Sequence, residues 1–91
     1  MESFMKMIEL FIMSGCPYCK VALEYLTELE ELGELKELQV RVIDEKIEKD
    51  LADSYDYYYV PAIFYLGKKL HEGALTKQKL SAVIKQVLEN E

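Results

Sequence analysis

Two cysteines, Cys16 and Cys19, stand where an apolar, β-prone run meets a helical pattern, and this junction constrains the fold more than any other feature of the sequence. Residues 5–12 are mostly apolar, as in a central strand, and Ser14-Gly15 ends the run. Beyond the cysteines, apolar residues recur at helical spacing, at Ala22, Tyr25, Leu26, Leu29 and Leu32. The sequence therefore predicts both cysteines in the first turn of a helix that directly follows a buried strand.

The middle of the chain predicts a second strand and a second helix. Residues 38–42 alternate in polarity, as a peripheral strand does. Asp44 is placed to cap the helix that follows, and the inner face of that helix would carry Ile47, Leu51 and Tyr55.

The C-terminal part predicts a hairpin and a last helix. Residues 61–66 form the third strand, and Gly67-Lys68 is expected to turn the chain into a partner strand over residues 69–72. Thr76 is suited to the N-cap of the last helix, because apolar residues flank it as a hydrophobic staple. The residues expected to pack inward here are Leu75, Leu80, Val83, Ile84, Val87 and Leu88.

The element order β-α-β-α-β-β-α defines the expected architecture. The first βαβ unit requires two parallel strands with a right-handed crossover, and the hairpin adds antiparallel strands. We therefore predict an α/β fold, with a four-stranded mixed sheet and helices on both faces. A chain of 91 residues is too short for two domains, because neither half could bury enough surface, so residues 1–91 are expected to form one domain.

Composition and charge exclude several classes of partner. The formal net charge of −6 opposes binding to nucleic acid, which requires a basic face. No segment is long and apolar enough to cross a membrane, and the N-terminus lacks the positive region and cleavage site of a signal peptide. We therefore expect a cytoplasmic protein that acts as a monomer.

The chemistry of the cysteine pair follows from its expected position at the helix start. Free backbone N–H groups and the helix dipole favour a thiolate there, which lowers the pKa of Cys16. Pro17 fits the first helical turn, where a missing N–H costs little. Cys19 lies one turn further on the same face, within reach of Cys16. Cys16 is thus expected to attack a disulfide, and Cys19 to resolve the mixed disulfide.

A metal site is the alternative interpretation of the pair. A zinc site needs four ligands, and the chain offers only His71 beside the two thiols. An iron–sulfur cluster shared between two subunits stays open as an alternative, in which the protein is a non-catalytic carrier. We predict no bound metal and no resident cofactor.

The segment from Ser14 to Cys19, Ser-Gly-Cys-Pro-Tyr-Cys, resembles the active site of dithiol glutaredoxins in the thioredoxin superfamily. Val60-Pro61, before an apolar strand, resembles the cis-proline loop of the same superfamily. The resemblance implies a thioredoxin fold and a thiol–disulfide oxidoreductase that reduces protein or glutathione mixed disulfides. It also implies that Val60 offers its backbone N–H and C=O to the substrate.

Two departures from the glutaredoxin pattern concern the source of electrons. Met13 stands where glutaredoxins usually carry a basic residue for glutathione, and Gly73 lacks the second glycine of their Gly-Gly pair. The segment from Gly73 to Lys77 instead resembles the entry to the last helix of thioredoxins. Glutathione as co-substrate and a flavoprotein reductase as partner therefore both remain open. Leu10 occupies the position at which thioredoxins bury an acid beneath the cysteines, so we expect no such proton acceptor.

Several tyrosines crowd the sequence before Pro61. Tyr18 and Tyr59 are candidates for substrate contact, because one lies between the cysteines and the other adjoins the proposed peptide-binding turn. Tyr55 is expected to pack inside. The substrate-binding candidates are thus Pro17, Tyr18, Tyr59, Val60, Pro61 and Gly73.

Overall fold

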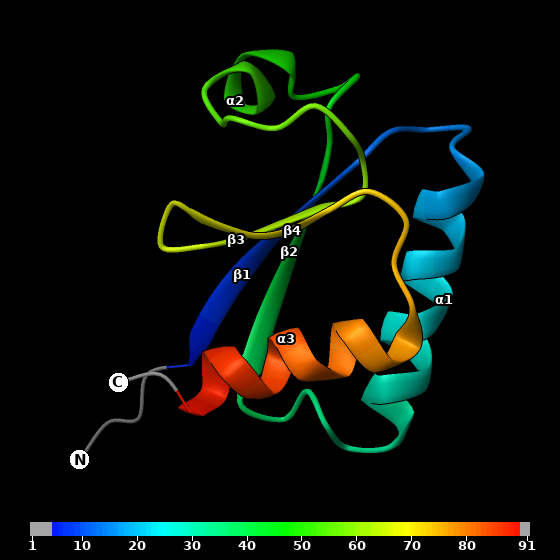
Figure 1. The fold of residues 1–91 in the computed structure, drawn as a ribbon, viewed down its shortest axis with the longest axis vertical. Helices are drawn as coiled ribbons and strands as arrows, with labels where there is room; N and C mark the ends of the chain where they lie inside the picture. The colour runs from blue at the N-terminus through cyan, green and yellow to red at the C-terminus, as the bar shows by residue number, and fades with distance from the viewer. Residues whose placement is uncertain (1–4, 90–91) are drawn as a thin grey trace.

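The computed structural model describes residues 5–89, which form a four-stranded sheet between two helical layers (Figure 1). Helices α1 and α3 cover one face, and α2 covers the other, so the predicted fold is confirmed. None of the helices within this range has the length and hydrophobicity that crossing a membrane requires. In chain order the elements are β1 (Lys6–Ile12), α1 (Pro17–Glu31), β2 (Leu38–Asp44), α2 (Lys49–Asp53), β3 (Ala62–Tyr65), β4 (Lys68–Glu72) and α3 (Lys77–Glu89).

The sheet has the strand order β2-β1-β3-β4, which places β1 in its interior. β1 and β2 are parallel, because α1 carries the chain back between them. The other pairs, β1 with β3 and β3 with β4, are antiparallel. Phe11 lies opposite Ala62 in this register. The C-terminal end of β1 and the N-terminal end of β3 therefore lie side by side at the same end of the sheet.

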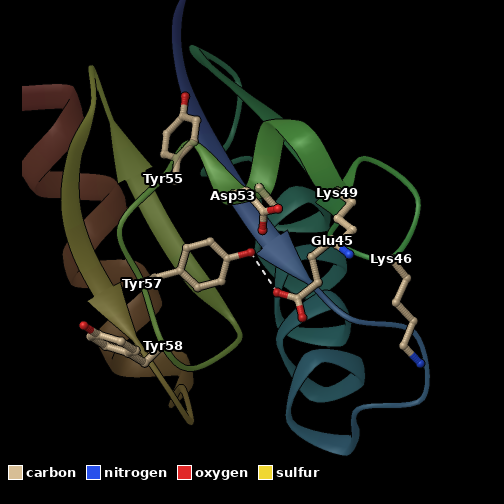
Figure 2. A pocket seen from close by; sticks show the side chains of 8 residues that line it. Glu45, Lys46, Lys49, Asp53, Tyr55, Tyr57 and Tyr58 are labelled. Atoms are coloured by element: carbon tan, nitrogen blue, oxygen red, sulfur yellow. Dashed lines mark hydrogen bonds between the residues drawn. The ribbon is translucent and has the colours of Figure 1, made fainter.

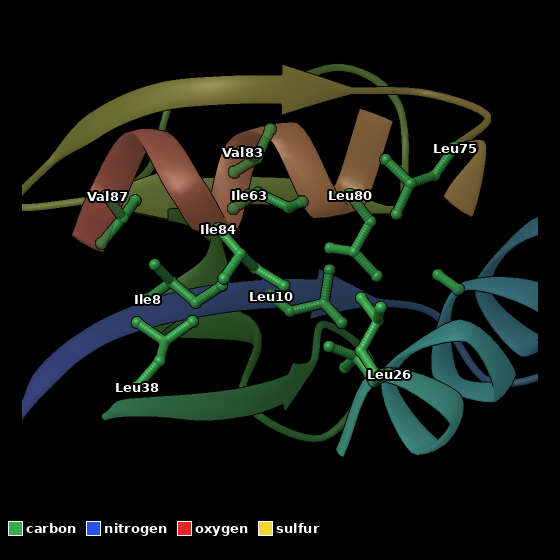
Figure 3. Packing of buried hydrophobic residues seen from close by; sticks show 12 residues of the cluster. Ile8, Leu10, Leu26, Leu38, Ile63, Leu75, Leu80, Val83, Ile84 and Val87 are labelled. Atoms are coloured by element: carbon green, nitrogen blue, oxygen red, sulfur yellow. The ribbon is translucent and has the colours of Figure 1, made fainter. Parts of the chain in front are cut away.

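Two hydrophobic cores lie on opposite faces of the sheet. Alternate residues of β1 point to different faces, so Leu10 joins the larger core beneath α1 and α3, and Phe11 joins the smaller core beneath α2. Figure 3 shows the larger core closing between the sheet and the two helices. Its buried residues are Ile8, Leu10, Ala22, Leu26, Leu29, Leu38, Ile63, Leu75, Leu80, Val83, Ile84 and Val87.

The ends of the two long helices are fixed by local hydrogen bonds. Beyond α1, Gly33 takes a positive φ of 79°, and its N–H donates to the carbonyl of Glu30 while Glu34 donates to that of Leu29. At the start of α3, the hydroxyl of Thr76 accepts a hydrogen bond of 3.0 Å from the N–H of Lys79. The predicted N-cap is therefore confirmed, and both flanking leucines are buried as the staple requires.

The second helix starts later than predicted. α2 begins at Lys49, and Ile47, which was expected on its inner face, is 79% exposed. The prediction that Asp44 caps this helix is wrong, because the carboxylate of Asp44 accepts hydrogen bonds from the Ser14 hydroxyl and the Lys46 N–H instead. Asp44 therefore ties the end of β2 to the loop that leads to the cysteines.

The hairpin turn lies one residue earlier than predicted. Leu66 and Gly67 both have positive φ, at 51° and 81°, and β4 already begins at Lys68. This is the backbone of a tight two-residue turn that matches the twist of its strands. Two leucines of the predicted apolar helix faces are less buried than expected. Leu32 is 65% exposed at the end of α1, and Leu88 is 36% exposed on α3.

Candidate functional site

Cys16 occupies the N-cap of α1, and Pro17 follows as the first helical residue. Gly15, with a φ of 86°, turns the chain out of β1, and the N–H of Cys16 donates to the carbonyl of Met13 at 3.1 Å. Cys16 is partly exposed, whereas Cys19 is 2% exposed and points into the protein. The predicted strand-to-helix junction thus presents one sulfur to solvent and buries the other.

The two thiols have opposite electrostatic surroundings. The pKa of Cys16 is lowered, chiefly because the Cys19 thiol donates a hydrogen bond to its thiolate, with further help from the N–H groups of Cys19 and Tyr18. The pKa of Cys19 is raised from 9.0 to about 12, chiefly because burial disfavours its thiolate. The pair therefore consists of a sulfur that ionises readily and a sulfur that holds its proton.

The expected cis-proline loop lies at the same end of the sheet as the cysteines. The Val60–Pro61 peptide bond is cis, and Pro61 is fully buried directly before β3. The backbone brings Gly73 to this loop, because its N–H donates to the carbonyl of Pro61 at 2.9 Å. Since β1 and β3 meet here, the loop and the cysteine-bearing turn share one end of the molecule.

The tyrosines divide into a packed pair and an exposed set. Tyr55 and Tyr57 stack around Phe11 with ring centroids 4.7 and 5.1 Å from it, so the expected packing of Tyr55 agrees with the structure. Tyr18 is 60% exposed and Tyr59 is 69% exposed, which leaves both rings available beside the predicted site. Tyr58, which was not among the candidates, is 83% exposed.

Glu45 is a residue of this region that the sequence analysis did not identify. Its N–H donates to the carbonyl of Ile12 at 2.9 Å, and its carboxylate accepts a hydrogen bond of 2.8 Å from the Tyr57 hydroxyl. Its negative charge acts to raise the pKa of both thiols, although the hydrogen bonds to Cys16 leave the pKa of that thiol lowered overall. Its position directly after β2 could have revealed it, because the ends of adjacent parallel strands lie together.

An open hollow of about 690 Å³ lies beside Glu45, between α2 and the segment over residues 55–58 (Figure 2). The dashed line in Figure 2 is the hydrogen bond between Tyr57 and Glu45, at the inner wall of this hollow. The residues that line it are Glu45, Lys46, Lys49, Ala52, Asp53, Tyr55, Tyr57 and Tyr58. Neither cysteine lines the hollow, and its link to the thiol pair is Glu45, whose charge acts on both thiols.

Metal coordination was the alternative interpretation of the thiols. Within residues 5–89, no three side chains of His, Cys, Asp or Glu gather closely enough to hold a metal ion. His71 instead uses its Nε2 atom for hydrogen bonds of 3.1 and 3.0 Å with the carbonyls of Gly73 and Ala74. The imidazole thus supports the turn after β4.

The sequence profile described as "Thioredoxin domain" matches residues 6–85. The chain belongs to the thioredoxin-domain family. A protein named "Probable Thioredoxin" from Methanothermobacter thermautotrophicus is 32% identical over 83 residues, which cover 90% of this chain and 95% of the relative. A second protein of the same name, from Methanothermobacter marburgensis, matches with the same identity and coverage.

Solved structures agree with this thioredoxin-domain assignment at the level of the fold. A mutant thioredoxin from Halobacterium salinarum superposes with a TM-score of 0.72 at 23% identity, covering 97% of this chain and 79% of its own. Mitochondrial thioredoxin 3 from Saccharomyces cerevisiae gives a TM-score of 0.71 at 20% identity, covering 92% of this chain and 80% of its own. This thioredoxin-domain protein is accordingly a thiol–disulfide oxidoreductase.

Proposed function

We propose that this protein reduces disulfide bonds in proteins by dithiol exchange, with Cys16 as the attacking thiol and Cys19 as the resolving thiol. One observation carries the proposal. The partly exposed sulfur has the lowered pKa, and the buried sulfur beside it has the raised pKa. Attack by a thiolate requires ionisation and access together, and only Cys16 combines them.

The exchange would proceed in two steps. The Cys16 thiolate attacks one sulfur of the substrate disulfide, a Cys16–substrate disulfide forms, and the other substrate sulfur leaves as a thiolate that takes up a proton. Cys19 then gives up its proton and attacks the Cys16 sulfur. This forms the Cys16–Cys19 disulfide and releases the second substrate sulfur, which is also protonated. The substrate gains two electrons, and the protein loses them.

The second step must overcome the raised pKa of Cys19. Leu10, at the position where a buried acid could accept this proton, is 1% exposed in the larger core. The proton of Cys19 would therefore pass to water or to the departing substrate thiolate. A resolving thiol of this kind reacts slowly until a mixed disulfide has formed beside it, because the bonded Cys16 sulfur carries no charge that raises the pKa of Cys19.

Substrate binding would use the loop at the same end of the sheet. Val60 would pair its backbone N–H and C=O with an extended substrate segment, and Pro61 and Gly73 would hold that loop in place. Tyr18 and Tyr59 would supply flat apolar contact on either side, since both rings are exposed. Pro17 would complete the surface next to the attacking sulfur.

We further propose that a flavoprotein reductase, and not glutathione, returns electrons to the oxidised pair. Met13 provides no cation for a glutathione carboxylate, Gly73 stands without a second glycine, and the net charge of −6 disfavours an anionic tripeptide. The Cys-Pro-Tyr-Cys sequence supports glutathione as the second candidate, because it resembles the glutaredoxin motif.

A reduction assay on the oxidised protein separates these candidates. The protein is offered NADPH together with either glutathione and glutathione reductase or a thioredoxin reductase, and NADPH consumption is followed in the presence of insulin. We expect turnover with the second system only, and loss of insulin reduction in both Cys16→Ser and Cys19→Ser. Rapid turnover with glutathione, together with reduction of a glutathione mixed disulfide by Cys19→Ser through Cys16 alone, would establish the second candidate instead.

A further inference from the structure

The loop before Pro61 is held by a side chain from the neighbouring hairpin. The N–H groups of Tyr58 and Tyr59 both donate to one carboxylate oxygen, Oε2 of Glu72, at 2.6 and 3.0 Å. Glu72 is the last residue of β4, and only 19% of its side chain is exposed. A single carboxylate thus fixes two consecutive backbone amides of a segment that belongs to no helix or strand.

The carboxylate is itself held in place from the hairpin. Its second oxygen, Oε1, accepts a hydrogen bond of 2.5 Å from the Lys69 ammonium group on the same strand. The Lys69 contact and the two amide hydrogen bonds lower the pKa of Glu72 to about 2, so the group stays ionised at any pH at which the protein works. The anchor therefore does not switch off by protonation in the physiological range.

The residue after Glu72 completes the arrangement. The N–H of Gly73 donates to the carbonyl of Pro61, and Glu72 lies opposite Ala62 in the strand register. The end of β4 therefore fixes the chain on both sides of Val60: Tyr58 and Tyr59 through a side chain, and Pro61 through the backbone. Val60 lies between these anchors, at the point where an extended substrate would pair.

We propose that Glu72 is a positioning residue of the substrate site, which fixes the Tyr58–Tyr59 backbone so that Val60 presents its N–H and C=O to a polypeptide substrate. This inference rests on the proposed function, because it assigns a role in binding a protein disulfide. Glu72 touches neither sulfur in this scheme, and it acts through the shape of the loop. Without the carboxylate, the loop must be ordered when the substrate binds, and that ordering weakens the complex.

The test compares a polypeptide disulfide with a small one. Reduced protein is mixed with excess insulin, and the rate of thiol loss is followed against insulin concentration. The same protein is then mixed with dithiodipyridine, which reaches Cys16 without pairing with Val60. For Glu72→Ala we expect the half-saturating insulin concentration to rise about five- to tenfold, as the loss of one or two hydrogen bonds would produce. The maximal rate and the dithiodipyridine rate should stay within about twofold of the wild type.

Two matched variants distinguish positioning from general stability. Glu72→Gln keeps an oxygen that can accept the amide hydrogen bonds, so it should recover most of the affinity for insulin. Lys68→Met removes an exposed cation of the same strand instead, so it should change the half-saturating concentration by less than about twofold. Faster hydrogen exchange at the Tyr58 and Tyr59 amides in Glu72→Ala would report the released loop directly.

The possible failures are separable. An unchanged half-saturating concentration in Glu72→Ala would overturn the role of Glu72 and leave the proposed function intact. An equal loss of the insulin and dithiodipyridine rates would also overturn it, because that result means general damage to the site. A wild-type protein that reacts with dithiodipyridine but does not reduce insulin would overturn the proposed function, and the positioning role with it.

Discussion

The difference between the two thiols can be measured by alkylation of the reduced protein with iodoacetamide at pH 8. Only thiolates react, so each rate follows the ionised fraction. With a pKa of about 12, Cys19 is ionised to about one part in 10⁴ at this pH. Cys16 has a pKa below its ordinary value of 9.0, so more than about a tenth of it is ionised. Cys16 should therefore react at least about 10³ times faster than Cys19, and the burial of Cys19 increases the ratio further.

The assay needs to assign the label to one of two neighbouring residues. A limiting amount of iodoacetamide is added to the native protein without oxygen, and the remaining thiols are labelled with an isotopic form after denaturation. Trypsin cleavage after Lys6 and Lys20 leaves both cysteines in one peptide, and fragmentation of that peptide locates each label. The same labelling in denaturant is the control, in which both thiols should react at similar rates.

Comparable labelling of both cysteines in the native protein at pH 8 would refute the reasoning. So would preferential labelling of Cys19. Either result would mean that burial does not suppress ionisation of Cys19, and the division into attacking and resolving thiols would have no electrostatic basis. Between pH 8 and pH 10, the Cys19 rate should still rise about tenfold per pH unit, because its pKa lies above this range.

Four further predictions concern charge and stability. Glu45→Gln removes a negative charge that raises the pKa of Cys16, so the pH profile of Cys16 alkylation should move to lower pH. Phe11→Ala should lower the free energy of unfolding in urea by about 3–5 kcal/mol, a large part of the roughly 5–14 kcal/mol expected for 91 residues. Tyr58→Ala, which truncates an exposed ring, should change the free energy of unfolding by less than about 0.5 kcal/mol. Leu66→Asn should raise the free energy of unfolding by about 1 kcal/mol in the same assay, because asparagine tolerates the positive φ at this position.

The sequence predicts the parts of this fold that depend on local patterns. The strand-to-helix junction at Cys16 follows from an apolar run, a glycine and a proline in the first helical turn. Thr76 is likewise identified correctly, because an N-cap and its staple involve residues only a few positions apart. The cis-proline loop was predicted only through the resemblance, since most bonds before proline are trans.

The features that the sequence does not predict depend on contacts between distant segments. Asp44 has the residue type of a helix cap, but its carboxylate accepts a hydrogen bond from the hydroxyl of Ser14, thirty positions away, instead. Leu66 looks like the continuation of an apolar strand, whereas the pairing of Tyr65 with Lys68 places Leu66 in the turn. Glu72 and Tyr58 are fourteen positions apart, and nothing in either local sequence indicates that they meet.

The alternation of β1 between the two cores bears on how the gene can vary. Deleting one residue of β1 before Leu10 would shift the strand register by one position. Phe11 would then point toward α1 and α3, and Leu10 would point toward α2. Both cores would then lose their shape together. The connection over residues 33–37 lies outside the strands and helices, so changes of length are better accommodated there.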